Sequence, residues 1–377
     1  MELLKFMNAH PNNWQELVAA EPYCLEVRQD GDYFLLKYNM IASDFNFKMV
    51  REARGSIFRY NPETEEWICV CHPFDKFFNY GEKYSAVHDI DWDGAAVQQK
   101  VDGSLIKIWY DRDKWHISTN GTIDAAKAEC GDYNFNFVVM QAISKISHFW
   151  DSLIPTRCYM FELTSPWNHI VIRYGGIGLW YLGCRDMIND KEIEQPLELA
   201  GLLHPVVFPH HSLSECVEAA HEMGNDEEGY VVCDANYNRI KIKGDEYLRL
   251  HKIRGNGPIT VLRVVEMWQE DTLDDFVAYY PEFKDFVESI TNDIYHLTEL
   301  CAIAYNAISH QPDVIERRDF ARYANTYMPP IRAYLYAKLD GKVESAIEFF
   351  LNMRSRTLAS YIVVKMETTK IGVEEDE

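Results

Sequence analysis

The sequence lacks the features that mark a membrane protein, a secreted protein or a zinc module. No apolar run approaches the roughly 20 residues that a membrane-spanning helix needs, and the N-terminal segment MELLKFMNAHPNNWQ has no basic-then-apolar signal pattern. The nine cysteines are an odd number, are scattered, and form no CxxC pair, so neither a disulfide framework nor a zinc site is expected. We therefore expect a cytoplasmic protein with no membrane association, and no segment indicates an obligate protein partner.

Positive charge is also scarce. The 377 residues include 37 Lys and Arg against 59 Asp and Glu, a net charge of −22. Because polyanions bind through Lys and Arg, the bulk charge argues against a nucleic-acid partner. However, residues 236–256 hold six basic residues against two acidic ones. We therefore expect a confined basic cleft on an otherwise acidic protein.

Aromatic and aliphatic residues are plentiful, and their spacing divides the chain into two predicted domains. Residues 1–256 contain short apolar strands and a few helical stretches without regular strand–helix alternation, which favours an α+β fold of antiparallel sheets with flanking helices. From residue 283, apolar residues recur at three- and four-residue steps, and further helical stretches follow at 319–339 and 343–364. We expect a boundary near residue 256 and an all-α C-terminal domain over 257–377.

The densest chemical signal is Lys100-Val-Asp-Gly-Ser104, which stands immediately before the apolar strand 105–110. A lysine next to an Asp-Gly turn is also an ordinary hairpin feature, and so short a motif recurs by chance. The functional interpretation is a lysine nucleophile. Such a lysine needs a deprotonated amine, and we expect burial and neighbouring cations to lower the pKa of Lys100.

Four other places support this interpretation. Glu162 lies within an apolar strand, where a charge is costly unless it is paired or bound to a ligand. Glu228 begins another strand. Alternation places three basic residues on one face of a strand, where phosphate would relieve their repulsion: Arg239, Lys241 and Lys243. Upstream, cations stand next to aromatic residues, at Arg54 and at Lys76-Phe77-Phe78. Each of these residues alone is also explained by a salt bridge, by an edge strand that lysine protects, or by packing in the core. Their order and spacing together favour a functional site.

Taken in this order, the segments resemble the lysine nucleotidyltransferases, a superfamily of ATP-dependent ligases and mRNA capping enzymes. Within it the chain is most similar to the bacteriophage-type RNA ligase 1 family. The resemblance implies a nucleotidyltransferase domain followed by a helical domain, ATP and Mg²⁺ or Mn²⁺ as cofactors, and single-stranded RNA or broken tRNA ends as partners. It also implies a lysyl-AMP intermediate, transfer of AMP to an RNA 5′-phosphate, and sealing by a 3′-hydroxyl. A phage-encoded enzyme would act in the host cytoplasm.

The resemblance also implies roles for individual residues. Lys100 would be the nucleophile, Asp102 and Gly103 would lie at the nucleotide or metal, and Ser104 would fix the turn. The residues expected to engage ATP are Arg54, Lys76 and Phe78. Glu162 would meet the ribose or the metal, Glu228 would bind the metal, and Lys241 and Lys243 would hold phosphates. Asp274 aligns loosely with a metal-binding carboxylate. One departure is that Ser118 and Asn120 stand where the family often carries lysines.

Two alternatives remain open. A DNA ligase or a capping guanylyltransferase would use the same lysine chemistry, but such enzymes normally continue into a β-rich OB domain, whereas this chain continues into a helical pattern. A non-catalytic RNA-binding relative would keep the fold. RNA binding alone would not require the whole set of Lys100, Glu162, Glu228, Lys241 and Lys243.

Overall fold

The computed structural model describes residues 1–168, 170–254, 259–270, 272–311 and 316–362. The chain divides into two compact units, Met1–Arg249 and Leu250–Glu377, and this division falls within helix α6 (Asp245–Arg254). The boundary expected at residue 256 lies outside the described residues. None of the described helices combines the length and apolar character needed to cross a bilayer.

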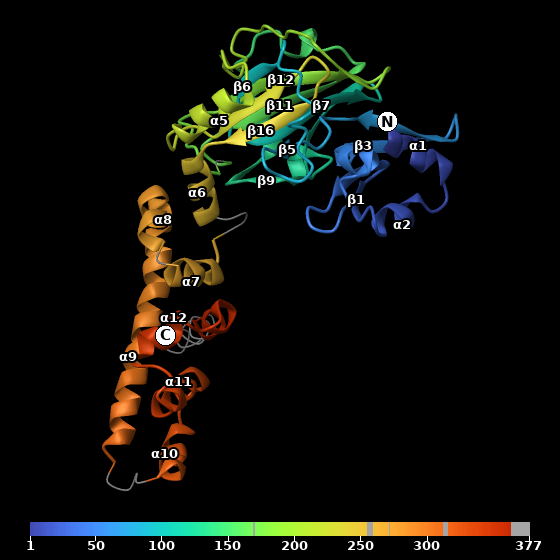
Figure 1. Cartoon of the computed structure of the whole chain (residues 1–377). Coiled ribbons are helices and arrows are strands. Elements are labelled where there is room, and N and C mark those ends of the chain that lie inside the picture. Colours follow the sequence, from blue (N-terminus) through green and yellow to red (C-terminus); the bar gives the residue numbers. More distant parts are fainter. Residues whose placement is uncertain (169, 255–258, 271, 312–315, 363–377) are drawn as a thin grey trace, which may run out of the picture. The chain divides into compact units, whose positions relative to one another are not determined.

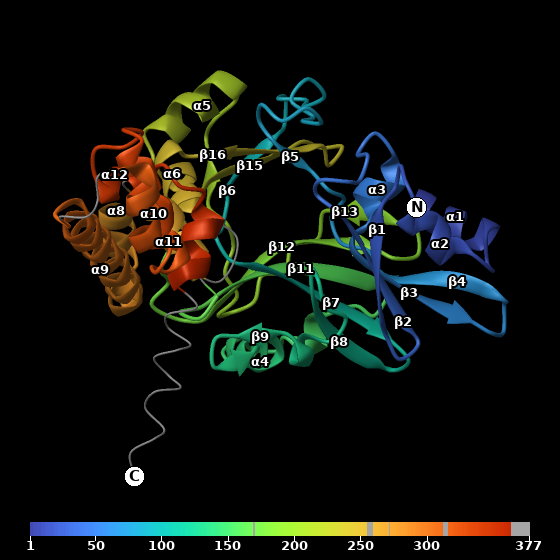
Figure 2. The same ribbon diagram turned by 90° about the horizontal axis from the view of Figure 1, so that it is seen from below.

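The N-terminal unit begins with a four-stranded antiparallel sheet (Figures 1 and 2). Its strands pair in the order β1 (Leu25–Asp30), β2 (Tyr33–Tyr38), β3 (Arg54–Asn61) and β4 (Glu66–Cys71). Three short helices pack against it: α1 (Glu2–Ala9), α2 (Trp14–Ala19) and α3 (Lys48–Glu52). The buried faces of these elements share one apolar core, and this core holds the start of β3 in place.

A five-stranded antiparallel sheet forms the centre of this unit. Its order is β13 (Lys191–Ile193), β12 (Gly178–Asp186), β11 (Arg157–Thr164), β7 (Ser104–Asp111) and β8 (Lys114–Thr119). Helix α4 (Phe135–Ile143) packs on it, and a two-stranded ribbon precedes this helix, β9 (Glu129–Cys130) with β10 (Tyr133–Asn134). Because β7 is adjacent to β11, the strand that follows Lys100 lies beside the strand that carries Glu162.

A second five-stranded sheet completes the unit. Its order is β14 (Val207–Phe208), β6 (Ala96–Gln99), β15 (Gly229–Cys233), β16 (Arg239–Lys243) and β5 (Phe78–Asn79), and helix α5 (Leu213–His221) packs on it. Only the β16–β5 pair within this sheet is parallel. In β16 the isoleucines are buried and the three basic residues lie on the other face, as the alternation predicted.

The described part of the C-terminal unit consists of helices. They are α7 (Val261–Gln269), α8 (Leu273–Tyr279), α9 (Lys284–Ser309), α10 (Arg317–Ala324), α11 (Pro329–Leu339) and α12 (Ala346–Leu351). The apolar stripe predicted from residue 283 is the buried face of α9, from Val287 to Ile308. The predicted helical stretch 343–364 contains α12, and its last two residues lie outside the described residues. The α+β class and the helical C-terminal part are therefore confirmed.

Candidate active site

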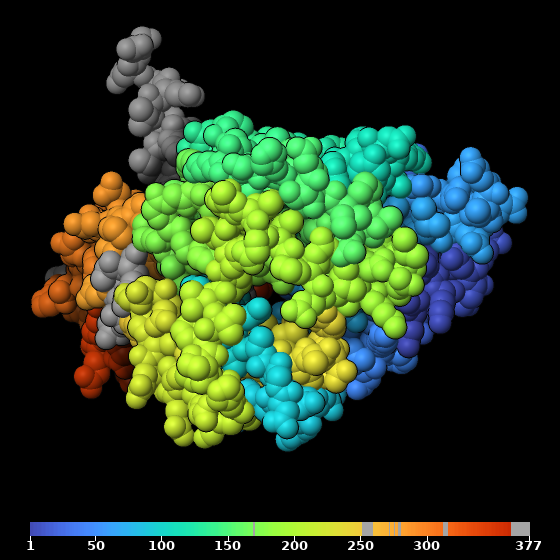
Figure 3. Space-filling view, turned by 90° about the horizontal axis from the view of Figure 1, so that it is seen from above, coloured from blue at the N-terminus to red at the C-terminus, as the bar shows by residue number. Residues whose placement is uncertain are grey.

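Lys100 lies at a cavity of about 250 Å³ in the N-terminal unit. Its wall includes four of the residues predicted for the site, Arg54, Lys100, Glu162 and Lys241, which come from β3, the end of β6, β11 and β16. The surface of this unit is visibly hollowed where cyan, yellow-green and yellow segments meet (Figure 3). The fold thus gathers side chains that are up to 187 positions apart in the sequence (241 − 54 = 187).

Glu228 joins two lysines of the site. Lys100 Nζ donates a hydrogen bond to Glu228 Oε2 over 2.6 Å, and Lys243 Nζ lies 3.1 Å from Glu228 Oε1. The pairing of β15 with β16 sets Gly229 opposite Lys243, which brings these side chains together. Burial would raise the pKa of Glu228, but the two ammonium groups outweigh it and lower this pKa. Because both carboxylate oxygens face amines, the metal-binding role of Glu228 stays a prediction.

The expectation that the pKa of Lys100 would be lowered is wrong for this structure. Burial does lower it, but the carboxylates Glu228 and Glu162 act in the opposite direction and prevail, so the pKa of Lys100 is raised. The expectation took account of burial and nearby cations but not of these carboxylates. Lys100 is therefore held as an ammonium group, and it must give up a proton before it can act as a nucleophile.

Glu162 is a carboxyl group poised to titrate near neutral pH. Burial raises its pKa to about 7, with Glu228 adding to the rise and Lys100 opposing it. Its side chain lines the cavity. A cation that entered the cavity would favour its ionised form, so this residue suits contact with a metal ion.

Two basic side chains lie against the ring of Phe77 on the cavity wall. The guanidinium carbon of Arg54 is 5.2 Å from the ring centroid, and Lys241 Nζ is 4.6 Å from it. Arg54 Nη1 is buried and has no hydrogen-bond partner within the described part of the chain. Burial, with Arg54 and Lys76 nearby, lowers the pKa of Lys241 to about 6. This group of cations would gain partners from an anionic ligand.

Two of the three residues predicted to engage ATP lie elsewhere than on this wall. Phe78 is buried against Phe45, at a centroid separation of 5.3 Å, and its neighbour Phe77 faces the cavity instead. Lys76 lies over the Phe78 ring and lines an adjacent cavity, and burial followed by repulsion from Arg54 lowers its pKa to about 8. Direct engagement of ATP by Phe78 and Lys76 stays a prediction.

Asp102 and Gly103 shape the turn that presents Lys100. The buried Asp102 carboxylate accepts hydrogen bonds from the backbone N–H groups of Val171 and Ile172, over 2.9 and 2.8 Å, and from the Tyr247 hydroxyl over 3.1 Å. A Cβ at Gly103 would lie 2.4 Å from the Leu163 carbonyl oxygen, so only glycine lets this turn pack on β11. Contact of either residue with a nucleotide or metal stays a prediction. Ser104 Oγ accepts a hydrogen bond from the Asn168 side chain over 3.0 Å.

Ser118 and Asn120, which stand where the resemblance implies lysines, lie in different surroundings. Ser118 is fully buried and accepts a hydrogen bond from Trp109 Nε1 over 2.9 Å, so it does not reach the cavity. Asn120 lines the cavity, and its Oδ1 has no partner within the described residues. Asp274 is an exposed residue of α8 in the C-terminal unit, and its metal role stays a prediction.

Lys107 is a residue of the site region that was not predicted from the sequence. This residue is fully buried in β7, and its Nζ donates a hydrogen bond to the Gly55 carbonyl. Gly55 has a φ of +80°, and a Cβ there would lie 2.9 Å from Lys107 Nζ and 2.5 Å from the Asn120 carbonyl oxygen. Lys107 therefore fixes the backbone next to Arg54. The available signal was a lysine inside the otherwise apolar strand LIKIWY.

Tyr247 is a second residue of the site region that was not predicted from the sequence. Besides its bond to Asp102, its ring lies 4.8 Å from Lys243 Nζ. It links the turn after Lys100 to the last lysine of β16. A tyrosine within a charged helical segment gave no indication of this contact.

Comparison with known proteins identifies relatives of the chain. A family model described as RNA ligase, of the phage T4 RNA ligase 1 type, matches residues 52–248. The chain is 31% identical over 278 residues to a putative bifunctional polynucleotide kinase/RNA ligase of Autographa californica nuclear polyhedrosis virus, covering 69% of this chain and 39% of that protein. It is 24% identical over 392 residues to an RNA ligase of Rhodothermus phage RM378, covering 83% and 86%. It thus spans about two-fifths of the baculoviral relative's length.

Among solved structures, an archaeal ATP-dependent RNA ligase aligns with a TM-score of 0.46 at 12% identity, covering 97% of this chain and 98% of that one. The family match covers more than half of the chain and includes every predicted site residue from Arg54 to Lys243. This match confirms the resemblance drawn from the motifs. The chain belongs to the phage T4 RNA ligase 1 family of RNA ligases.

Proposed function

We propose that the chain is an ATP-dependent RNA ligase that joins an RNA 5′-phosphate to a 3′-hydroxyl. The observation that carries this proposal is the contact of Lys100 with Glu228 at the mouth of a cavity lined by Arg54 and Lys241. A lysine that can become the nucleophile, a carboxylate in contact with it and basic side chains facing the cavity form the set that transfer of a nucleotidyl group needs.

The first step would form a phosphoramidate bond between Lys100 Nζ and the α-phosphorus of ATP, with loss of pyrophosphate. The Lys100 ammonium must first lose a proton, and cations brought next to it with the substrate would lower its pKa. Glu228 Oε2, 2.6 Å away, would hold the amine in position. Arg54 and Lys241 would face the triphosphate, where fixed cations stabilise the charge that spreads over the phosphate oxygens. AMP would then pass to the RNA 5′-phosphate, and a 3′-hydroxyl would displace it.

The carboxylates of the site fit a divalent ion held mostly by its substrate. The described residues contain no group of three His, Cys, Asp or Glu side chains that could form a protein cage. Mg²⁺ is commonly bound by one or two carboxylates together with substrate phosphates, and Glu162 offers one such carboxylate. When bound, Mg²⁺ or Mn²⁺ would neutralise charge on the phosphates. Glu162 would hold it from the cavity wall.

The proposed polynucleotide substrate is single-stranded RNA or the ends of a broken tRNA. The reaction would take place in the cytoplasm of the cell in which the enzyme is made. The test is to incubate the protein with α-labelled ATP or GTP and Mg²⁺, and then with 5′-phosphorylated single-stranded RNA or nicked duplex DNA. We expect labelled protein with ATP and circular or joined RNA.

The other outcomes distinguish the alternatives. Label from GTP alone would indicate a capping enzyme, and sealing of nicked DNA without RNA would indicate a DNA ligase. Neither is favoured, since the described part of the C-terminal unit is helical and no OB-type strands are found there. No label from either nucleotide, under conditions in which the protein is folded, would leave a non-catalytic RNA-binding relative.

ATP binding is expected to take up protons at pH 8. The pKa of Lys241 is about 6 and that of Lys76 about 8, so at pH 8 Lys241 is mostly neutral and Lys76 is about half neutral. A bound triphosphate raises both pKa values, so the two amines gain protons. The affinity for ATP should accordingly fall as the pH rises from 6 to 9.

Titration calorimetry at pH 8, where ATP is fully ionised, measures this uptake when it is repeated in buffers with different heats of ionisation. Proton uptake should shrink in Lys241→Gln. Proton release, or no proton exchange, would contradict the assignment of Lys241 and Lys76 to the phosphates.

A further inference from the structure

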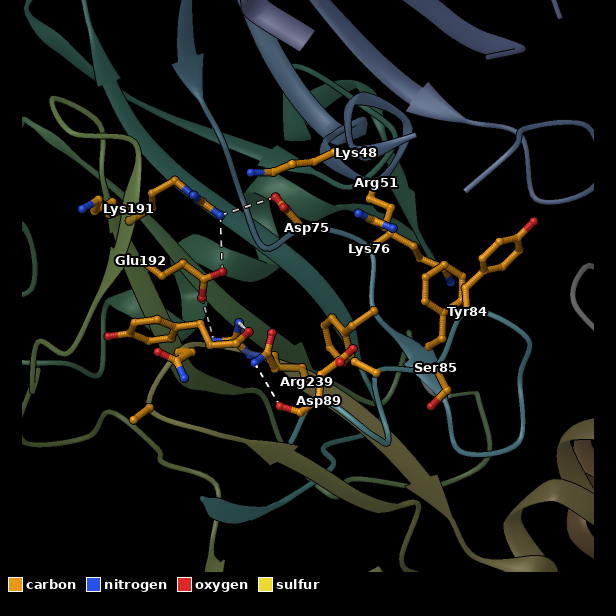
Figure 4. Close-up of a pocket in the computed structure, with 18 residues that line it drawn as sticks. Lys48, Arg51, Asp75, Lys76, Tyr84, Ser85, Asp89, Lys191, Glu192 and Arg239 are labelled. Carbon is orange, nitrogen blue, oxygen red and sulfur yellow. Dashed lines mark hydrogen bonds and ion pairs between the residues drawn. The ribbon is translucent and has the colours of Figure 1, made fainter. Parts of the chain in front are cut away.

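A second cavity, of about 820 Å³, lies beside the Lys100 cavity, and most of its lining residues have no role in the proposed nucleotidyl transfer. We call it the outer cavity (Figure 4). It shares Phe77 and Arg239 with the Lys100 cavity, so the two are neighbours. Its charged and polar lining comes from α3, the segments 75–78 and 84–89, β12, β13 and the turn before β16.

Cations outnumber acids on the wall of the outer cavity. Six basic residues line it, against three acidic ones, on a protein whose net charge is −22. The basic residues are Lys48, Arg51, Lys76, Arg185, Lys191 and Arg239, and the acidic ones are Asp75, Asp89 and Glu192. The local excess of positive charge is therefore opposite in sign to the rest of the protein.

Two of the three acids, Glu192 and Asp75, lie near arginines of the same wall, and Asp75 also contacts His72 over 3.0 Å. Arg185 Nη2 lies 3.3 Å from Glu192 and 3.5 Å from Asp75, and Arg239 Nη2 lies 2.7 Å from Glu192 (dashed lines in Figure 4). These contacts leave few acidic partners for Lys48 and Lys191, the two lysines at the rim of the cavity.

The rim lysines are accessible. Lys48 is about half exposed, and Glu52 is 3.9 Å from its Nζ. Lys191 is exposed and makes no ion pair with any residue that the structure describes. Two long cationic side chains thus remain available to a ligand at the mouth of the cavity.

The rest of the lining suits a nucleic-acid strand better than a small anion. The half-buried rings of Tyr84 and Phe77 lie on its wall, and Ser85 Oγ is buried without a hydrogen-bond partner among the described residues. Asn236 and Asn238 add side-chain amides. Sites for single-stranded nucleic acid combine cations that follow the phosphates with aromatic faces and polar groups for sugars and bases.

We propose that the outer cavity binds the sugar–phosphate backbone of single-stranded RNA next to the end that is being sealed. This inference rests on the proposed ligase function. The RNA end must reach the phosphorus attached to Lys100, and a strand lying in the outer cavity would pass Phe77 to enter the neighbouring cavity. Lys48 and Lys191 would contact phosphates, and ATP would be bound by Arg54 and Lys241 without them.

The test is the double charge reversal Lys48→Glu/Lys191→Glu, both sites being exposed and outside the core. Formation of lysyl-AMP from ATP should stay within about twofold of the unmodified protein. Transfer of AMP from lysyl-AMP to a short 5′-phosphorylated RNA should fall about tenfold or more, and the slope of log affinity for RNA against log salt should fall by about two. RNA binding is measured by fluorescence anisotropy.

The matched control is Lys5→Glu/Lys145→Glu, which makes the same change of charge at two exposed lysines outside both cavities. It should affect RNA transfer less than threefold. Equal losses in the two double variants, or RNA transfer unchanged in Lys48→Glu/Lys191→Glu, would overturn the proposal. So would a parallel loss of lysyl-AMP formation, which would assign the cavity to ATP.

A failure of the proposed ligase function can be distinguished from a failure of the proposed RNA site. A protein that forms no lysyl-AMP contradicts the proposed function, yet its affinity for RNA can still be compared between the two double variants. Loss of RNA affinity only in Lys48→Glu/Lys191→Glu would then support the outer cavity as an RNA site by itself.

Discussion

Lys100→Ala is expected to abolish transfer of AMP from ATP to the protein, a loss of several orders of magnitude, because no other group would form the covalent bond. Sealing of 5′-phosphorylated RNA should be lost with it. The final step, attack of a 3′-hydroxyl on RNA that already carries AMP, does not need the lysine nucleophile. Sealing of pre-adenylylated RNA should therefore persist in the variant.

Sealing of pre-adenylylated RNA by Lys100→Ala would show that the variant is folded. Lys114→Ala, at an exposed lysine of β8, is the matched control and should keep all three steps. Labelling of Lys100→Ala at more than a few per cent of the normal level would contradict the role of Lys100. If Lys100→Ala loses all three steps and its circular dichroism spectrum shows that it is unfolded, the experiment is repeated with Lys100→Met, which preserves most of the side-chain volume.

Lys107→Met is expected to raise the ATP concentration needed for lysyl-AMP formation by about tenfold to a hundredfold, the usual cost of losing a hydrogen bond from a charged group. The buried amine holds the Gly55 carbonyl and so aims Arg54, whose Nη1 has no described partner, into the cavity. Methionine removes a costly buried cation, so the free energy of unfolding should stay the same or rise. Denaturant unfolding and ATP titrations of labelling measure the two effects.

Exchange of Lys107 and Ser118 gives this prediction a sharper control. Lys107 lies directly opposite Ser118 in the β7–β8 pair, and Ser118 is one of the positions where the resemblance implies a lysine. Lys107→Ser should lose ATP affinity, and the double variant Lys107→Ser/Ser118→Lys should recover part of it, because the amine returns to the same place from the neighbouring strand. Loss of stability in proportion to the loss of activity, with no recovery in the double variant, would indicate a structural role alone.

The elements that the sequence predicted well are those in which local pattern decides the outcome. Alternation placed the basic residues of β16 on one face and its isoleucines in the core. The three- and four-residue spacing after Phe283 predicted the buried stripe of α9. Both patterns depend on the residues of a single element, so they can be recognised without knowing what packs against it.

What the sequence did not predict depends on pairing between distant strands. The raised pKa of Lys100 comes largely from Glu228, 128 positions away (228 − 100 = 128), which β6 and β15 bring within 2.6 Å. The choice between Phe77 and Phe78 as the cavity wall is set by the parallel pairing of β5 with β16. Lys107 becomes meaningful only once β7 is placed beside β8 and Gly55 is brought next to its amine.

The position of the bound AMP shows directly which residue is the nucleophile. The protein is incubated with ATP and Mg²⁺, its intact mass is measured, and the adduct is mapped by peptide mass spectrometry under conditions that preserve the phosphoramidate bond. We expect one AMP per chain, on the peptide that contains Lys100. No adduct, or an adduct on Lys241 or Lys243, would contradict it.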